Sequence, residues 1–145
     1  MELSENFSLE ELCRTETGVV NQPGEKELEK LLYLATYILQ PIRNKFGEIT
    51  VTSGYRSPAV QAALTAQGRP TSNTISQHTQ GEAADIVSDK FDLQLVFDWI
   101  RVYLPFGQVI IEEWHGKRWV HVSLPRIAKQ NQQALVYDGS GYRNA

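Results

Sequence analysis

The 145-residue sequence has a single cysteine, no long apolar run and no signal-peptide pattern. Because Cys13 has no partner for an internal disulfide, the fold cannot depend on a disulfide scaffold, and we interpret this residue as a small buried side chain in a first helix. No apolar run approaches the roughly 20 residues of a membrane span. The N-terminal MELSENFSLEEL lacks a basic and an apolar segment, so we expect synthesis in the cytoplasm without a signal peptide.

Positive charge is also scarce. The net charge is −3 and the pI is about 5.6, so no broad basic surface is available to bind nucleic acid or an anionic membrane. The apolar fraction of 41% suits a globular protein, and 145 residues suit one domain with one core. We therefore predict a single domain over residues 1–145, with a core at about 25–124 and a polar C-terminal tail at 125–145. Within that tail, only 134–137 is expected to pack. Oligomeric state is left open.

Helical spacing and capping residues predict four helices. Ser8 and Glu11 form a capping box for a short first helix, and an apolar stripe predicts a long helix from Glu25 to Gly47 that Pro41 is expected to kink. Further helices are predicted at 57–68 and 91–104, and strands at 49–53, 83–87, 108–112 and 119–124. This order predicts an α+β fold, in which helices cover one side of a small, mostly antiparallel sheet. We expect the site on the open side.

The stretch SQHTQGEAAD at 76–85 suggests a metal site. His78 and Asp85, together with His121, supply two imidazoles and one carboxylate, the ligand set of a catalytic zinc that keeps a fourth position for water. Gly81 permits the tight turn between the first two ligands, and the small side chains after it leave space beside the metal. Taken singly, these residues could instead be a loop histidine, a cap and a core histidine.

A hairpin over 108–124 supplies the candidate general base. If its turn centres between Gly116 and Lys117, Glu112 lies directly opposite His121 on the same face. Glu112 could then move a proton during hydrolysis, although a one-residue slip would favour Glu113. His115 is interpreted as a turn residue.

Arg56 follows a predicted strand in the turn SGYRS. An exposed guanidinium at such a place can bind a substrate carboxylate or stabilise an oxyanion. The alternative, an ion pair with a neighbouring acid, is equally compatible with the composition.

Four motifs, SGYRS at 53–57, SQHTQGEAAD at 76–85, QVIIE at 108–112 and WVHVS at 119–123, together resemble the zinc D-Ala-D-Ala carboxypeptidase family. That family includes vancomycin-resistance D-Ala-D-Ala dipeptidases and phage L-alanyl-D-glutamate endolysins, and its wider group includes lysostaphin-type peptidases and the hedgehog signalling domain. The resemblance spans about residues 28–124. It implies a hedgehog-like fold, zinc ligation by the three predicted ligands, and substrate contacts from Tyr55, Arg56 and Ser76.

The sequence differs from several relatives at the positions where those relatives carry their general base. Those relatives place glutamate three residues before the last ligand, or histidine two residues before it, whereas here Arg118 and Trp119 stand at these positions. Family forms with a QLIxE hairpin place the acid at the position equivalent to Glu112.

The resemblance implies a zinc peptidase that hydrolyses amide bonds in bacterial peptidoglycan, with stem peptides as its substrate and a phage or prophage as a suitable source. The bond cleaved, and whether the action is endo- or exopeptidic, are left open. The alternative is a non-catalytic module that keeps the zinc shell for recognition of the cell wall or of a protein. A third reading, a simple α+β domain without metal, would disregard the agreement of so many motif positions.

Overall fold

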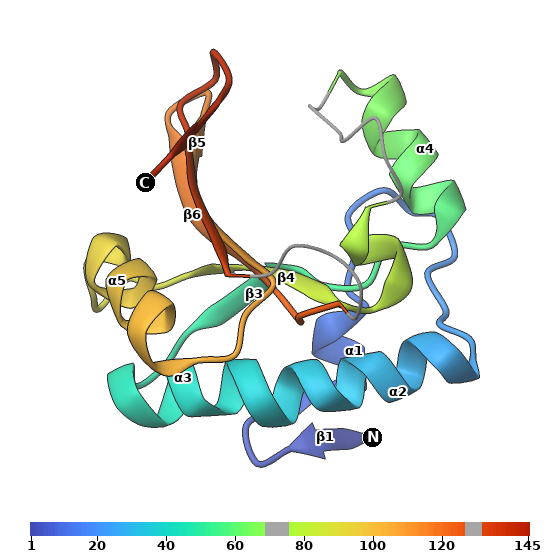
Figure 1. The fold of residues 1–145 in the computed structure, drawn as a ribbon. Helices are drawn as coiled ribbons and strands as arrows, with labels where there is room; N and C mark the ends of the chain where they lie inside the picture. Colours follow the sequence, from blue (N-terminus) through green and yellow to red (C-terminus); the bar gives the residue numbers. More distant parts are fainter. Residues whose placement is uncertain (69–75, 127–131) are drawn as a thin grey trace.

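The computed structural model describes residues 1–68, 76–126 and 132–145 (Figure 1). Its central sheet has six strands in the order β3 (Thr50–Ser53), β4 (Ala83–Val87), β6 (Lys117–Ser123), β5 (Gln108–Trp114), β7 (Gln133–Tyr137) and β8 (Tyr142–Asn144). Only β5 and β7 pair in parallel, and the other neighbours are antiparallel. Two short strands, β1 (Glu2–Ser4) and β2 (Phe7–Ser8), form a separate pair. The prediction of an α+β fold with a mostly antiparallel sheet is confirmed.

The helices include all four predicted segments, and Ser8 caps the first of them as predicted. They are α1 (Leu9–Leu12), α2 (Glu25–Leu34), η1 (Ala35–Leu39), α3 (Gln40–Phe46), α4 (Pro58–Ala66), η2 (Gln77–Gln80) and α5 (Leu93–Tyr103). Side-chain oxygens of Ser8, Ser57 and Asp92 accept hydrogen bonds from backbone N–H groups in the first turns of α1, α4 and α5. No helix in the described part of the chain has the length and hydrophobicity of a membrane span.

The long predicted helix runs without a break but changes its winding. Segments α2, η1 and α3 follow one another along one rod, and η1 is a π-helical turn that ends just before Pro41 (Figure 1). Proline has no N–H to donate and its ring crowds the preceding turn, so the helix widens there. The predicted kink at Pro41 is replaced by this π turn, which lies just before the proline.

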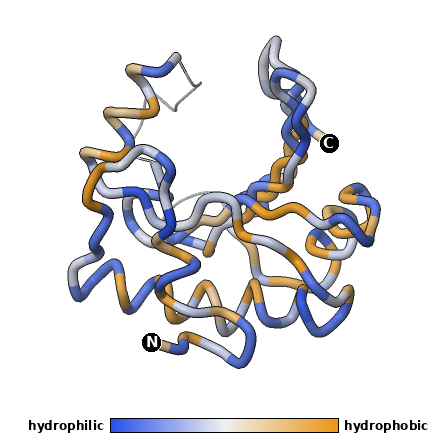
Figure 2. Tube along the Cα trace, turned by 180° about the vertical axis from the view of Figure 1, so that it is seen from behind, coloured by the Kyte–Doolittle hydropathy of each residue, from blue (hydrophilic) through white to orange (hydrophobic). Residues whose placement is uncertain are grey.

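The hydrophobic core lies between one face of the sheet and the helices α1, α2, η1, α3 and α5. The sheet contributes alternate residues, and the long rod and α5 contribute their apolar stripes (Figure 2). This arrangement confirms that helices cover one side of the sheet. Leu3, Phe7 and Leu12, near the N-terminus, also belong to the core.

The C-terminal segment was predicted to be polar with only 134–137 packing, and the strand of this segment does pack on the core. Its pairing was not predicted: β7 pairs with the edge of β5 and β8 pairs with β7. Ala134 and Val136 pack against the core, while the backbone of β7 satisfies the N–H and C=O groups that the edge of β5 would otherwise expose. A polar composition did not reveal this, because an edge strand needs few buried side chains to be held by its backbone.

The β5–β6 hairpin turns one residue earlier than predicted. His115 and Gly116 both have positive φ angles, 50° and 76°, as a two-residue turn of type I′ requires. His121 is therefore opposite Ile110, and Glu112 is opposite Trp119. The predicted pairing of Glu112 with His121 is wrong by two residues. An even shift keeps each side chain on its own face, so Glu112 still shares a face with His121.

Candidate metal centre

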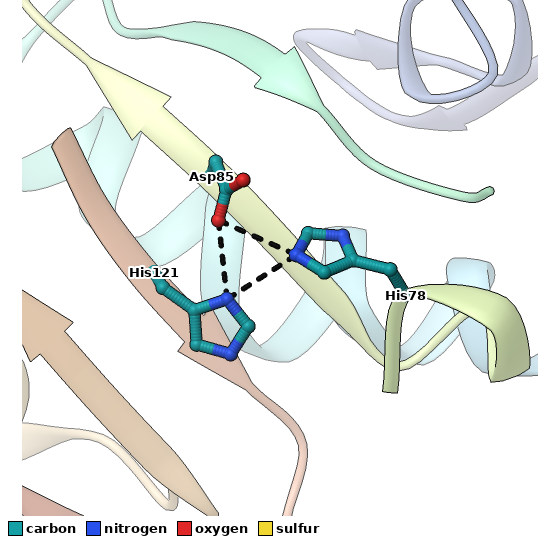
Figure 3. Close-up of side chains that lie close together, drawn as sticks. All are labelled: His78, Asp85 and His121. Atoms are coloured by element: carbon teal, nitrogen blue, oxygen red, sulfur yellow. Dashed lines mark hydrogen bonds and ion pairs between the residues drawn. The ribbon is translucent and has the colours of Figure 1, made fainter. Parts of the chain in front are cut away.

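Three predicted ligands converge on the face of the sheet opposite the core, which we call the site face. Asp85 on β4 is directly opposite His121 on β6, and His78 reaches them from η2 (Figure 3). His78 Nε2 lies 3.2 Å from His121 Nδ1 and 3.4 Å from Asp85 Oδ1, and His121 Nδ1 lies 3.1 Å from the same Oδ1. His78 and His121 are 43 positions apart in the chain. Together with Asp85, each places one ligand atom around a single point.

These separations fit a tetrahedral metal shell. A zinc ion with bonds of about 2.0–2.2 Å would hold its ligand atoms roughly 3.3–3.6 Å apart, close to the observed spacing. The three residues are buried, with exposures of 4% for His78, 4% for Asp85 and 8% for His121. Two imidazole nitrogens and one carboxylate oxygen are the donor types that zinc prefers. The residues therefore fit the metal that the sequence predicts.

The protonation of His78 also favours a metal. Its Nδ1 lies 2.8 Å from the carbonyl oxygen of Gly54, which can only accept, so Nδ1 carries the proton and Nε2 presents a lone pair to the cluster. Burial, followed by the charge of Arg56, lowers the pKa of His78 to about 4. The imidazole is thus neutral near neutral pH. Its Nε2 then faces the oxygen of Asp85 with no proton between them, an unfavourable contact that a cation would relieve.

Asp85 is held ionised and fixed in position. Burial would raise the pKa of this carboxyl, but in the acid range, where His78 is itself protonated, the charges and hydrogen bonds of His78 and His121 outweigh burial and hold the pKa of Asp85 well below its usual range. Its second oxygen, Oδ2, accepts a hydrogen bond from Arg56 Nη2 at 3.2 Å. The carboxylate therefore uses one oxygen for the cluster and the other for a guanidinium.

Close backbone packing positions the loop that carries His78. Gly81 ends η2 in the left-handed conformation, with φ of 74°, and a Cβ there would lie 2.5 Å from the carbonyl oxygen of Glu27 on α2. On the other side, Gln77 Nε2 donates to the carbonyl of Leu124, whose N–H donates to the carbonyl of Glu82. The loop is thus fixed between α2 and the end of β6.

The residues predicted to contact substrate lie deeper than expected. Arg56 is only 8% exposed, and it donates from Nε to Ser53 Oγ at 2.9 Å and from Nη1 to Gln61 Oε1 at 3.3 Å. The expectation of an exposed guanidinium is therefore wrong, because these acceptors and Asp85 draw it inward. Tyr55 is 5% exposed and its ring belongs to the core. Ser76 is half-buried, and its Oγ accepts from the N–H of His78 at 3.2 Å.

The remaining hairpin residues separate by face. Glu112 is half-buried on the site face, two residue pairs farther out along the hairpin than His121. Glu113 is paired with Arg118 and faces the other way. His115 is an exposed turn residue, as the sequence analysis expected. Its ring lies against that of Trp114, with the ring centroids 3.9 Å apart.

Sequence reasoning missed two parts of the site. The Gly54 carbonyl that sets the tautomer of His78 is a backbone group, and only its place in the SGYRS motif hinted at a role. The bond between Arg56 and Asp85 joins residues 29 positions apart, and residue types alone did not choose this acid among 17.

A buried cluster of two histidines and one carboxylate on an α+β sheet is typical of a metal-dependent hydrolase. Residues 5–123 match the sequence model of the family described as Peptidase M15. The chain therefore belongs to the Peptidase M15 family, whose members are metallopeptidases, usually with zinc. The His78, Asp85 and His121 cluster lies within the matched region and could bind a metal. A search of curated proteins found no match.

Proposed function

We propose that this protein is a zinc-dependent peptidase that hydrolyses amide bonds in the stem peptides of bacterial peptidoglycan. The observation that carries the proposal is the convergence of His78 Nε2, Asp85 Oδ1 and His121 Nδ1 at separations of 3.1–3.4 Å. Membership of a metallopeptidase family supports it. The cell-wall substrate rests on the resemblance of the motifs to D-Ala-D-Ala carboxypeptidases and L-alanyl-D-glutamate endolysins, and action at the wall, in a phage or prophage setting, is part of the same proposal.

Zinc bound by these three residues would supply Lewis-acid activation of the attacking water and of the scissile carbonyl. Glu112 accepts the proton that the water loses and delivers it to the leaving amine, so that the amide bond breaks as the new carbon–oxygen bond forms. Its half-buried position on the site face suits this role. It lies two residue pairs from His121 along the hairpin, a distance of about 7 Å along a strand, which a glutamate side chain can partly span.

Arg56 and Ser76 are the proposed substrate contacts. Arg56 already bonds Asp85, so its guanidinium lies beside the carboxylate where a substrate carbonyl or carboxylate would bind. Ser76 stands at the start of the loop that carries His78. Tyr55 was also predicted to contact substrate, but its side chain is buried in the core, so we propose no substrate contact for it.

Digestion of purified peptidoglycan tests the proposal. The zinc-loaded protein should release new termini that mass spectrometry assigns to one bond type, and a chelator should stop the release until zinc is restored. New termini at D-Ala-D-Ala would show carboxypeptidase action, and termini at L-Ala-D-Glu would show endopeptidase action. Absence of any new terminus from zinc-loaded protein would refute the peptidase.

A non-catalytic zinc module is the second candidate. The observation that favours it is the register of the β5–β6 hairpin. Because Glu112 is opposite Trp119 and not His121, its carboxylate is offset from the ligand cluster. A zinc-loaded protein that binds peptidoglycan without cleaving it would support this candidate.

A further inference from the structure

A row of aromatic side chains crosses the site face beside the metal ligands. Three successive strand pairings define this row. Glu112 on β5 is paired with Trp119 on β6 and, on its other side, with Tyr137 on β7. Tyr137 is in turn paired with Tyr142 on β8. Residues aligned across neighbouring strands share one face of a sheet. We call Trp119, Glu112, Tyr137 and Tyr142 the aromatic row.

The aromatic row is continuous with the candidate metal centre. A second row of aligned residues crosses the same sheet and contains two of the metal ligands: Asp85, His121, Ile110 and Leu135. On β6, β5 and β7 this row lies two positions along the strand from Trp119, Glu112 and Tyr137. Two residues along a strand span about 7 Å. A substrate longer than the scissile bond itself can therefore reach both. In Figure 1 the outer part of the β5–β6 hairpin, with the C-terminal strands beside it, rises away from the helices.

The rings are accessible to a ligand. Tyr142 is 59% exposed, and Tyr137 and Trp119 are half-buried. The rings of Tyr137 and Tyr142 lie 4.8 Å apart at 39°, so they form a joint surface. Trp119 carries the one buried side-chain donor without a hydrogen-bond partner in the described part of the chain, its indole N–H.

The polar groups in the aromatic row match a hydroxylated ligand. The phenols of Tyr137 and Tyr142 can donate or accept, and the carboxylate of Glu112 accepts. The hydroxyl of Tyr142 is protonated near neutral pH. Half-exposed rings edged by hydrogen-bonding groups suit a sugar, whose C–H faces stack on aromatic rings while its hydroxyls bond the edges. A nucleic acid is disfavoured, because Glu112 and a net charge of −3 repel phosphates.

We propose that the aromatic row is a subsite for the sugar rings of the glycan strand to which the stem peptide is attached. This inference rests on the proposed function, because it is the peptidoglycan substrate that links a peptide to a sugar. Tyr137 and Tyr142 lie beyond residue 123, where the family match ends, so the family assignment does not cover them. They are specificity-determining residues and take no part in the chemistry.

The test compares two substrates that carry the same stem peptide, one free and one linked to its N-acetylglucosamine–N-acetylmuramic acid disaccharide. Tyr142→Ala should raise KM for the linked substrate by about three- to tenfold and leave the free peptide unchanged. Tyr142→Phe, which keeps the ring, should retain most of the preference. The control is the stacked pair Tyr33 and Tyr37, with ring centroids 6.1 Å apart, on α2 and η1, and its double alanine variant should leave both substrates unaffected.

A binding measurement separates this inference from the proposed function. Peptide-free glycan tetrasaccharide is titrated into the full-length zinc-loaded protein and into Tyr142→Ala, with tryptophan fluorescence as the readout and circular dichroism to verify the fold. Weaker binding by the variant supports the subsite even if no bond is cleaved. Equal binding by both proteins, or no binding by the wild type, refutes it even if peptides are hydrolysed. Equal loss on free and linked substrates would instead assign the aromatic row to the peptide.

Discussion

Arg56 Nη2 donates to Asp85 Oδ2 at 3.2 Å, while Oδ1 of the same carboxylate faces His78 and His121. The side chains of Arg56 and Asp85 are 10% and 6% exposed, so water screens their interaction little. A carboxylate held through its outer oxygen keeps its inner oxygen aimed at the cluster. Arg56 therefore positions a predicted metal ligand, in addition to any contact with substrate.

Replacing Arg56 by alanine should weaken zinc binding. Loss of a partner to a ligand typically costs 10–100-fold in metal affinity, and in metal-free protein a broken buried ion pair costs about 3–5 kcal/mol of folding stability. Competition with a chromophoric chelator measures the affinity. Arg118→Ala is the control, because its ion pair with Asp92 is long, at 3.9 Å, and exposed. An unchanged affinity with a raised KM would restrict Arg56 to substrate binding.

Removal of a predicted ligand should abolish metal binding. His78→Ala, Asp85→Ala and His121→Ala each leave only two donors, too few for a stable zinc shell. Metal analysis after dialysis against micromolar zinc should find one zinc per wild-type chain and almost none per variant. His115→Ala removes the turn histidine and should keep the full zinc content. Stoichiometric zinc in the three ligand variants would place the metal elsewhere.

Glu112→Gln should separate catalysis from metal binding. The amide cannot accept a proton, so kcat should fall by about 10²–10⁴-fold while zinc content stays unchanged. Glu113→Gln serves as the matched control on the opposite face of the same strand, and its kcat should match that of the wild type. If the Glu113 variant loses activity and the Glu112 variant keeps it, the assignment of the base from the hairpin register is incorrect.

Gly81→Ala should destabilise the loop between the first two ligands. Any side chain there adopts a left-handed backbone and also meets the carbonyl of Glu27, so we expect a loss of at least about 2–3 kcal/mol in the free energy of unfolding. Gly18 has nearly the same φ, 73°, with no atom near its added Cβ, so Gly18→Ala should lose only about 1 kcal/mol. Urea unfolding measures both, and equal losses would show that the contact with α2 is unimportant.

The thiol of Cys13 should react slowly. Burial, followed by the negative charge of Glu10, raises its pKa to about 11 from the usual 9.0, so at pH 8 the reactive thiolate is about a hundredfold scarcer than in an unfolded chain. Alkylation by iodoacetamide, followed by mass spectrometry, should be slower by that factor in the native protein than in urea. Equal rates would show that the region around α1 opens readily.

Much of the fold could be predicted because its signals are local. Ser8 and Ser57 begin helices through hydrogen bonds to residues three positions away, and alternation along 119–123 assigned its side chains to faces. That alternation assigned a face to His121, and Glu112 stayed on the same face because the error in register was even. Local rules therefore predicted which residues could meet, and with them the candidate ligands.

Residue types, spacing and motif order alone determined the class of fold, the three candidate ligands and the resemblance to zinc peptidases. Only the tertiary structure decided the rest: that Glu112 is paired with Trp119, that Arg56 bonds Asp85, that the Gly54 carbonyl sets the tautomer of His78, and that β7 and β8 extend the site face. Each of these depends on a turn geometry or on a contact between distant segments. Such contacts are selected by the packing of the whole chain, because many residues of the right type compete for each partner and the sequence pattern does not rank them.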